Sequence, residues 1–177
     1  QERYAEEIAF ADHWIGEVMK AVDERSSPRE TIVVLTADHG EAMGEAGRHF
    51  VHGLTCTPEV ARVPFLIRAA GLTPERRDAL VHHVDILPTI LDAAGATTDI
   101  ERHGRSLRPV LENAGAPWRE FLVCEFHMHG PPWFPQRGIR DSRYKLIHNL
   151  LADSAKPSGQ VDGDIGYTVS REDRYDG

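Results

Sequence analysis

The feature that most constrains this chain is an apolar run that ends abruptly in an acid, an imidazole and a glycine, Thr31-Ile32-Val33-Val34-Leu35-Thr36-Ala37-Asp38-His39-Gly40. Residues 32–35 show no polar alternation, which favours a parallel strand covered on both faces over a strand with one wet face. In open α/β sheets the ligand crevice lies beyond the carboxyl ends of the strands. The pattern therefore places Asp38 and His39 where such a fold keeps its chemistry.

The Asp38-His39-Gly40 turn has two interpretations when it is taken alone. A carboxylate beside an imidazole can supply one oxygen and one nitrogen ligand to a divalent cation, with the remaining ligands coming from elsewhere. The same residues fit a helix N-cap aspartate followed by a surface histidine, because Asp is a favoured N-cap. We expect Gly40 to occupy a turn that needs unusual backbone angles.

A glycine-rich loop with several basic residues follows this turn. It contains Gly44-Glu45-Ala46-Gly47, then Arg48, His49 and His52-Gly53, and it leads to a second short strand at 63–68. Three potential cations between two strands are well placed to hold an oxyanion beside a metal. The loop therefore favours the metal interpretation of the turn.

Several blocks of the sequence carry a family resemblance. The stretch from Asp38-His39-Gly40-Glu41 through His52-Gly53 to Arg62-Val63-Pro64 resembles the second half of the sulfatases, within the alkaline phosphatase superfamily. Further blocks follow in family order over residues 1 to 150, namely Tyr4 with Ile8, Asp12, Ile15 and Gly16, then 83–91 with Ala94-Gly95, 103–107, 137–140 and 143–149. The last block, with Glu125 and His129 ahead of it, is most similar to the branch that includes heparan N-sulfatases.

The resemblance implies an α/β, alkaline phosphatase-like fold, with the end of a mostly parallel central sheet flanked by helices and part of a small antiparallel C-terminal sheet. We expect residues 1-115 to be the C-terminal part of the sulfatase α/β catalytic domain and residues 116-177 to start the smaller C-terminal subdomain. The chain opens inside an amphipathic helix pattern and closes on a polar stretch without a period. We therefore expect it to be a segment of a longer protein, cut at both ends.

Local patterns predict the individual elements. We expect a helix over 4–24, strands over 31–37, 63–68 and 121–126, a short charged helix after Pro74, a helix over 85–94, and a hairpin over 138–149 that turns near Asp141-Ser142. Asp85 is expected to cap its helix and Gly95 to end it. We therefore interpret Asp85 as a structural residue.

The family's nucleophile is expected outside this chain. Sulfatases use a formylglycine that is made from Cys or Ser in a Cys/Ser-x-Pro-x-Arg signature near the start of the protein. Cys56-Thr57-Pro58-Glu59 imitates that signature, but Val60 replaces its arginine and the segment lies downstream of the Asp-His-Gly turn instead of upstream. We expect the isolated chain to show no sulfatase turnover and only weak metal affinity, because the nucleophile and half of the ligands are missing.

The resemblance also assigns the site residues of this chain. Asp38 and His39 would complete a metal shell begun by upstream acids. Calcium is the expected cation; many sulfatases have Asn at the position of His39, and since imidazole suits manganese or zinc better, those metals stay open. His52 matches a Lys or His of the family that binds the anion or protonates the leaving oxygen, with a solvated loop histidine as the alternative. His129 and Arg48 are expected to bind substrate, with a structural histidine as the alternative for His129 and a solvated loop residue as the alternative for Arg48.

The leading functional hypothesis is a hydrolase of sulfate esters or sulfamates, acting on a small molecule or a carbohydrate. A phosphoester or phosphonate ester hydrolase of the same superfamily is the first alternative, and a non-catalytic relative that keeps the fold for binding is the second. The net charge of -8 argues against nucleic acid as a partner, because phosphate binding needs concentrated Lys and Arg. No apolar run is long enough to cross a bilayer.

Overall fold

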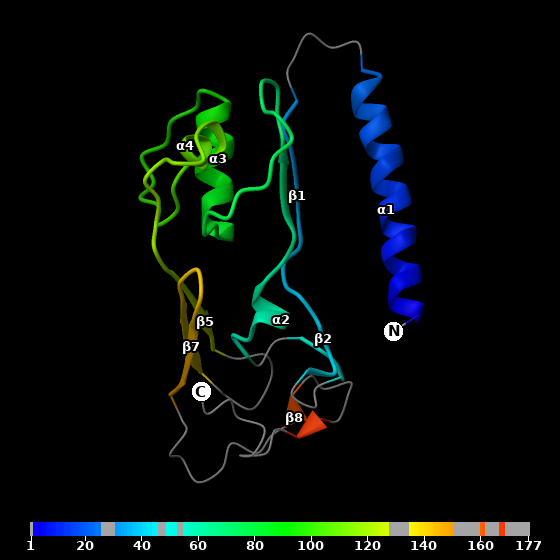
Figure 1. Ribbon diagram of the computed structural model, residues 1–177, viewed down its shortest axis with the longest axis vertical. Coiled ribbons are helices and arrows are strands. Elements are labelled where there is room, and N and C mark those ends of the chain that lie inside the picture. Colours follow the sequence, from blue (N-terminus) through cyan, green and yellow to red (C-terminus); the bar gives the residue numbers. More distant parts are fainter. Residues whose placement is uncertain are drawn as a thin grey trace. The chain divides into compact units, whose positions relative to one another are not determined.

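The structure, a computed structural model, describes residues 2–25, 31–45, 49–52, 55–127, 135–150, 160–161 and 167–168, with backbone alone at 49–51 and at the last two pairs. Contacts divide the chain into two compact units, Gln1–Ala37 with Pro64–Gly71, and Asp38–Val63 with Leu72–Gly177. Figure 1 labels some of the elements of each unit. Among the helices that the structure describes, none has the length and apolar character needed to cross a bilayer.

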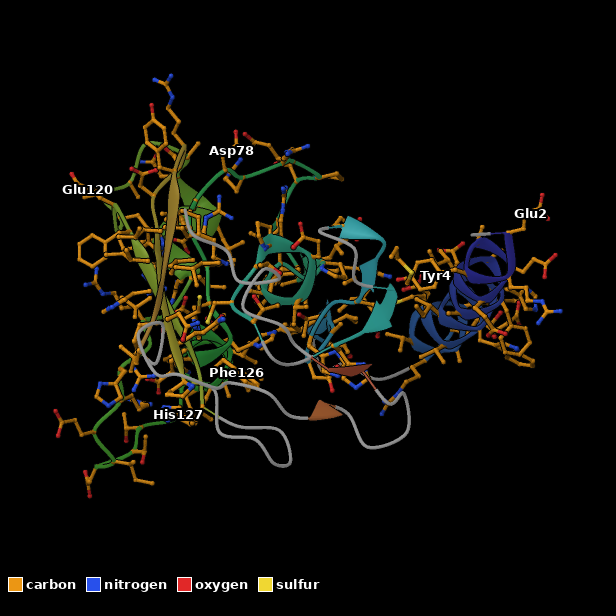
Figure 2. All side chains as sticks on the ribbon, turned by 90° about the horizontal axis from the view of Figure 1, so that it is seen from below. Glu2, Tyr4, Asp78, Glu120, Phe126 and His127 are labelled. Atoms are coloured by element: carbon orange, nitrogen blue, oxygen red, sulfur yellow. The ribbon has the colours of Figure 1, made fainter. Side chains whose placement is uncertain are left out.

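The first unit begins with the predicted amphipathic helix, α1 (Glu2–Asp23). Its apolar stripe is not covered within the described structure, since Ile8 is 55% exposed and Val18 is 62% exposed. Figure 2 shows side chains standing out around this helix, with Glu2 and Tyr4 labelled. The helix is tied to strand β4 (Phe65–Arg68) through an ion pair between the Asp23 carboxylate and the Arg68 guanidinium.

The strand that precedes the Asp-His-Gly turn forms as expected, as β1 (Val33–Thr36). The sequence predicts a parallel strand, but the described partner of β1 is β4, which runs antiparallel to it. Val33 lies opposite Arg68 and Thr36 opposite Phe65, so the prediction is wrong for this pair. All four residues of β1 are half-buried, so complete coverage of both faces is not observed either. An apolar run reports how much of a strand is buried, and it carries no information on the direction of the neighbouring strand.

The second unit combines short helices with antiparallel strands. Its elements are β2 (Ala42–Met43), β3 (His49–Val51), α2 (Pro58–Ala61), η2 (His83–Asp85), α3 (Ile86–Ala93), α4 (Arg108–Glu112), β5 (Leu122–Phe126), β6 (Gln136–Arg140), β7 (Lys145–Asn149), β8 (Gln160–Val161) and β9 (Tyr167–Thr168). Strands β5, β6 and β7 form a three-stranded antiparallel sheet, and β2–β3 and β8–β9 form separate pairs. The predicted strand at 121–126 and the predicted hairpin are therefore confirmed.

The hairpin turn between β6 and β7 lies where the sequence predicts it. The Asp141 carboxylate accepts hydrogen bonds from the backbone N–H groups of Arg143 (2.7 Å) and Tyr144 (2.5 Å), as an Asx turn does. The Asp141 N–H in turn donates to the Tyr144 carbonyl at 3.0 Å. These bonds hold the pKa of Asp141 below its usual range.

Asp85 is the buried polar centre of this unit. Its side chain is 0% exposed and pairs bidentately with Arg119, at 2.6 and 2.7 Å. The carboxylate also accepts the N–H groups of His82 and Arg105, each at 2.9 Å. The structural role predicted for Asp85 is confirmed, but its carboxylate caps η2 and makes no capping bond to α3. Gly95, at φ 62°, ends α3 as predicted.

The charged helix predicted after Pro74 is wrong, because residues 72–82 are not helical in the structure. Tertiary contacts use the open backbone of this segment instead. The Arg77 guanidinium donates to the carbonyl oxygens of Val110 (2.9 Å) and Leu111 (3.2 Å), which satisfies acceptors at the end of α4. The Leu80 carbonyl accepts a bond from the Trp118 indole N–H at 2.7 Å.

The two cysteines lie together against β6. A Cβ built on Gly138 would fall 2.6 Å from the Cys124 sulfur and 3.1 Å from the Cys56 Cβ, so the glycine makes room for both side chains. Both thiols are free. The hydrogen bond between them lowers the pKa of Cys124, to which Lys145 also contributes, and the same bond together with burial raises the pKa of Cys56.

Candidate metal and anion site

The Asp-His-Gly turn follows β1 directly. Asp38 is exposed, and its carboxylate accepts the His39 backbone N–H at 2.9 Å, which lowers the pKa of Asp38. The His39 Nδ1 lies 3.0 Å from the Gly40 carbonyl oxygen. A carbonyl oxygen only accepts, so Nδ1 carries the proton and the neutral ring presents Nε2 as a ligand atom.

Gly40 is required here for a different reason from the one predicted. Its φ is not among the positive values of the described glycines, so unusual backbone angles do not explain it. The Gly40 N–H donates to the Val60 carbonyl at 2.7 Å, and a Cβ at this position would fall 2.0 Å from the Glu59 carbonyl oxygen. The turn is thus fastened to α2 by a backbone approach that no side chain permits.

Strand pairing brings two more side chains, those of Glu41 and His52, close to the Asp-His-Gly turn. Ala42 pairs with Val51 in the β2–β3 ladder, so the residues that flank this pair, Glu41 and His52, come together from opposite ends of the loop. The His52 Nδ1 lies 2.9 Å from the Glu41 Oε2. The His39 and His52 rings stack with their centroids 4.4 Å apart and their planes 17° from parallel.

The segment after His52 is anchored in the protein interior. Thr55, Cys56 and Thr57 are all buried, and the Cys56 N–H donates to the Gln136 side-chain oxygen at 3.0 Å. Gln136 is itself buried at the start of β6. The C-terminal arm of the loop therefore has a firm attachment to the three-stranded sheet.

His39, Glu41 and His52 form a cluster of the kind that binds divalent cations. Their ligand atoms all lie within 4.8 Å of one another. The Glu41 Oε1 is buried and has no hydrogen-bond partner among the described residues, as a carboxylate oxygen would if it faced a cation. One carboxylate and two imidazoles are a donor set that manganese and zinc accept more readily than calcium does. The cluster therefore fits a bound metal, and the 2.9 Å contact between Glu41 and His52 also fits an imidazole held by a carboxylate.

The structure places the predicted site residues unevenly. His39 and His52 meet in the cluster, whereas the Asp38 carboxylate lies beside His39, 3.6 Å from its Nε2, and is not one of the clustered groups. Arg48 and His129 lie outside the described residues. Glu41 had no predicted role, although it stands in the Asp-His-Gly-Glu block. Only the pairing of β2 with β3 identifies it.

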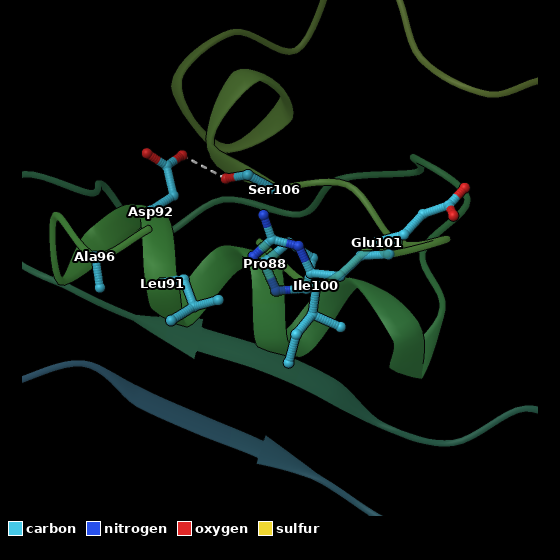
Figure 3. Close-up of a pocket in the computed structure, with 9 residues that line it drawn as sticks. Pro88, Leu91, Asp92, Ala96, Ile100, Glu101 and Ser106 are labelled. Atoms are coloured by element: carbon cyan, nitrogen blue, oxygen red, sulfur yellow. Dashed lines mark hydrogen bonds between the residues drawn. The ribbon is translucent and has the colours of Figure 1, made fainter. Parts of the chain in front are cut away.

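A separate pocket lies beside α3 in the same unit, with a volume of about 520 Å³ (Figure 3). Pro88 and Leu91 from α3 line it together with Ile100, Glu101 and a hydrogen-bonded pair, Ser106 Oγ to Asp92 Oδ2 at 2.5 Å. Of the predicted site residues that the structure describes, Asp38, His39 and His52, none lines this pocket. The described part of the chain therefore combines helices and small antiparallel sheets with a candidate metal site in the segment that follows β1 in the sequence.

Comparisons with known proteins identify the family. The sulfatase family model matches residues 1–96, and the model described as N-sulphoglucosamine sulphohydrolase, C-terminal, matches residues 50–155. The chain belongs to the sulfatase family, within the alkaline phosphatase superfamily. The second match agrees with the predicted likeness to the heparan N-sulfatase branch. Sulfatases are hydrolases that act on sulfate esters and are in general metal-dependent, and the family's fold is α/β.

Three relatives have nearly the same sequence identity to this chain. The Delta 4,5-hexuronate-2-O-sulfatase of Bacteroides thetaiotaomicron is 31% identical, over 90% of this chain and 37% of its own length. The N-acetylglucosamine-6-O-sulfatase of that organism is 32% identical, over 82% of this chain and 27% of its own length. The multifunctional alkaline phosphatase superfamily protein PehA of Trinickia caryophylli is 32% identical, over 80% of this chain and 30% of its own length. The chain thus spans about a third of the curated relatives that it matches.

Proposed function

We propose that the protein containing this chain hydrolyses a sulfuric ester on a carbohydrate, and that this chain supplies one wall of the active site. The observation that carries the proposal is the cluster of His39, Glu41 and His52 beside Asp38, in a chain of the sulfatase family. The carbohydrate substrate follows from relatives named for hexuronate and N-acetylglucosamine sulfates. The formylglycine nucleophile would come from a preceding segment.

Each residue of the wall has a proposed role. Asp38 and His39 hold a divalent cation, which when bound would polarise the sulfuryl group and favour the ionised nucleophile. Calcium is the metal that the family resemblance favours, while the two imidazoles support manganese or zinc. His52 binds the sulfate oxygens or protonates the leaving oxygen, a role in which a positioned imidazole contributes about 10²–10⁴-fold. Arg48 and His129 bind the substrate.

The finer architecture is also part of the proposal. Strand β1, together with its antiparallel partner β4, belongs to a mostly parallel central sheet whose remaining strands come from outside this chain. Residues 1–115 are the end of the catalytic domain, and residues 116–177 begin the smaller C-terminal subdomain with the β5–β7 sheet as its first layer. A sheet completed in this way would also cover the exposed stripe of α1.

The test compares sulfate and phosphate monoesters of 4-nitrophenol as substrates of the full-length protein. We expect the sulfate to be hydrolysed faster, and we expect His39→Ala to lower both turnover and the bound metal measured by mass spectrometry. His103→Ala, an exposed histidine of the same unit, is the matched control and should change neither. The isolated 177-residue chain should show no turnover. Hydrolysis of an aryl sulfate by that chain, abolished in Asp38→Ala, would contradict the proposal.

A phosphoester hydrolase is the second candidate, because the superfamily relative PehA is as similar to this chain as the sulfatases are. Imidazole ligation of the metal is compatible with that chemistry. A higher kcat/KM on the phosphate ester would favour it. Metal binding without hydrolysis of either ester would instead indicate a relative that has lost activity.

A further inference from the structure

The contact between Glu41 and His52 restrains the imidazole in a way that stacking alone does not. Stacking on His39 keeps the two ring planes within 17° of each other, but it does not determine which ring edge faces which way. The 2.9 Å contact from Nδ1 to the Glu41 Oε2 lies on one edge of the ring and sets that orientation. Together the two contacts define both the plane of the ring and its rotation.

The chemistry of the contact also selects a tautomer. A carboxylate accepts hydrogen bonds, so the bond to Glu41 needs the proton on Nδ1 and assigns proton exchange with a substrate to Nε2. The Glu41 side chain is 24% exposed, and its low exposure strengthens a charge-assisted bond relative to one in open water. The β2–β3 ladder holds the two backbones in register on either side of the contact.

We propose that Glu41 is a positioning residue that holds the His52 imidazole, through Nδ1, in the orientation from which Nε2 protonates the leaving oxygen. The inference rests on the proposed function. As the S–O bond breaks, its electron pair stays on the leaving oxygen, which takes the proton from Nε2, and the sulfuryl group would pass to the ionised nucleophile oxygen that the preceding segment supplies. Glu41 keeps its contact with Nδ1 while Nε2 donates the proton.

The dependence on the leaving group tests this role in the full-length protein. We expect Glu41→Ala to lower kcat about 100-fold on an alkyl sulfate, whose leaving oxygen needs a proton, and less than 10-fold on 4-nitrophenyl sulfate, whose phenolate leaves without one. KM and metal content should change little. Glu41→Gln should recover part of the loss, since its amide oxygen still accepts a bond from Nδ1.

Glu45→Gln is the matched control, because the Glu45 carboxylate lies in the same loop and accepts the Met43 N–H at 2.6 Å. It should leave both substrates unaffected. An equal loss on the two substrates in Glu41→Ala would overturn the positioning role. Loss of bound metal in that variant would also overturn it and would make Glu41 a ligand.

A second measurement does not depend on turnover. Long-range ¹H–¹⁵N correlation spectra of the full-length protein with labelled histidine should show the neutral His52 ring protonated on Nδ1, and protonated mainly on Nε2 in Glu41→Ala. Protonation of the wild-type ring on Nε2 would refute the positioning role even if the enzyme is active. Absence of sulfate hydrolysis by a wild-type protein with the Nδ1 tautomer would refute the proposed function and leave the Glu41 contact supported.

Discussion

Replacing Asp85 by asparagine keeps the number of non-hydrogen atoms and almost the same volume, yet it should be among the most destabilising substitutions in the second unit. The carboxylate accepts four hydrogen bonds, two from Arg119 and one each from the N–H groups of His82 and Arg105. An amide has a single acceptor oxygen, so its NH₂ group must face two of these donors. Arg119, whose side chain is 12% exposed, also loses its counter-charge.

The expected cost of this substitution is about 3–5 kcal/mol, the range for breaking a buried ion pair from one side. Hydrogen exchange followed by mass spectrometry is the appropriate assay, because the Arg105 N–H is itself bonded to Asp85. At about 1.4 kcal/mol for each factor of ten, exchange of this amide should become roughly 10²- to several 10³-fold faster. Asp78→Asn, at an exposed carboxylate, is the control and should stay within about 0.5 kcal/mol. Unchanged protection of Arg105 in Asp85→Asn would refute the reasoning.

The same carboxylate predicts a pH dependence. Burial raises the pKa of Asp85, but the hydrogen bonds from Arg119, Arg105 and His82 outweigh burial and leave it below its usual range. The stabilisation is therefore complete above the unfolded-state pKa of about 3.9, and it is lost as the pH falls below that value through the folded-state pKa. Protection around η2 and α3 should be level from pH 7 to about pH 5 and decline under about pH 4. A decline that begins near neutral pH would contradict this assignment.

Two further predictions concern tight packing and thiol chemistry. Gly40→Ala should lower the free energy of unfolding by about 1–3 kcal/mol in urea denaturation and reduce the bound metal, because the new Cβ meets the Glu59 carbonyl. In the control variant Gly16→Ala the new Cβ meets no atom within 4 Å, so stability should be unchanged or higher. Equal denaturation midpoints for the two variants would argue against the close approach at Gly40. Iodoacetamide at pH 7 should alkylate Cys124 well before Cys56, since the lowered pKa of Cys124 gives more thiolate. Peptide mapping that finds Cys56 modified first would contradict the hydrogen bond assigned between the two thiols.

Local patterns predicted the elements well where a short stretch of chain contains the determining information. The period of α1, the apolar run of β1 and the hairpin turn near Asp141 are all local, and each element formed at its predicted place. The charged segment after Pro74 shows the limit of such reasoning. Its backbone conformation depends on acceptors more than 30 residues away, at Val110 and Leu111.

The candidate site could be predicted from the sequence only in part, for the same reason. His39 and His52 stand in recognisable motifs, and the structure brings both rings together. Glu41 could be assigned only from the register of β2 on β3, which depends on the irregular ladder at Ala42 and Met43 and not on any local pattern. The apolar run favoured a parallel strand, but β1 pairs antiparallel with β4, because hydrophobicity reports burial and not strand direction.

The close approach at Gly40 has a consequence for how this site tolerates sequence change. Where a glycine is present for its positive φ, as at Gly95, asparagine is a natural substitute because it tolerates left-handed angles. At Gly40 the obstacle is the Glu59 carbonyl oxygen 2.0 Å from the Cβ position, and every other residue type brings the same Cβ. In a saturation library scored for function, we therefore expect Gly95 to accept a short list of residues and Gly40 to accept none, unless a second change moves α2.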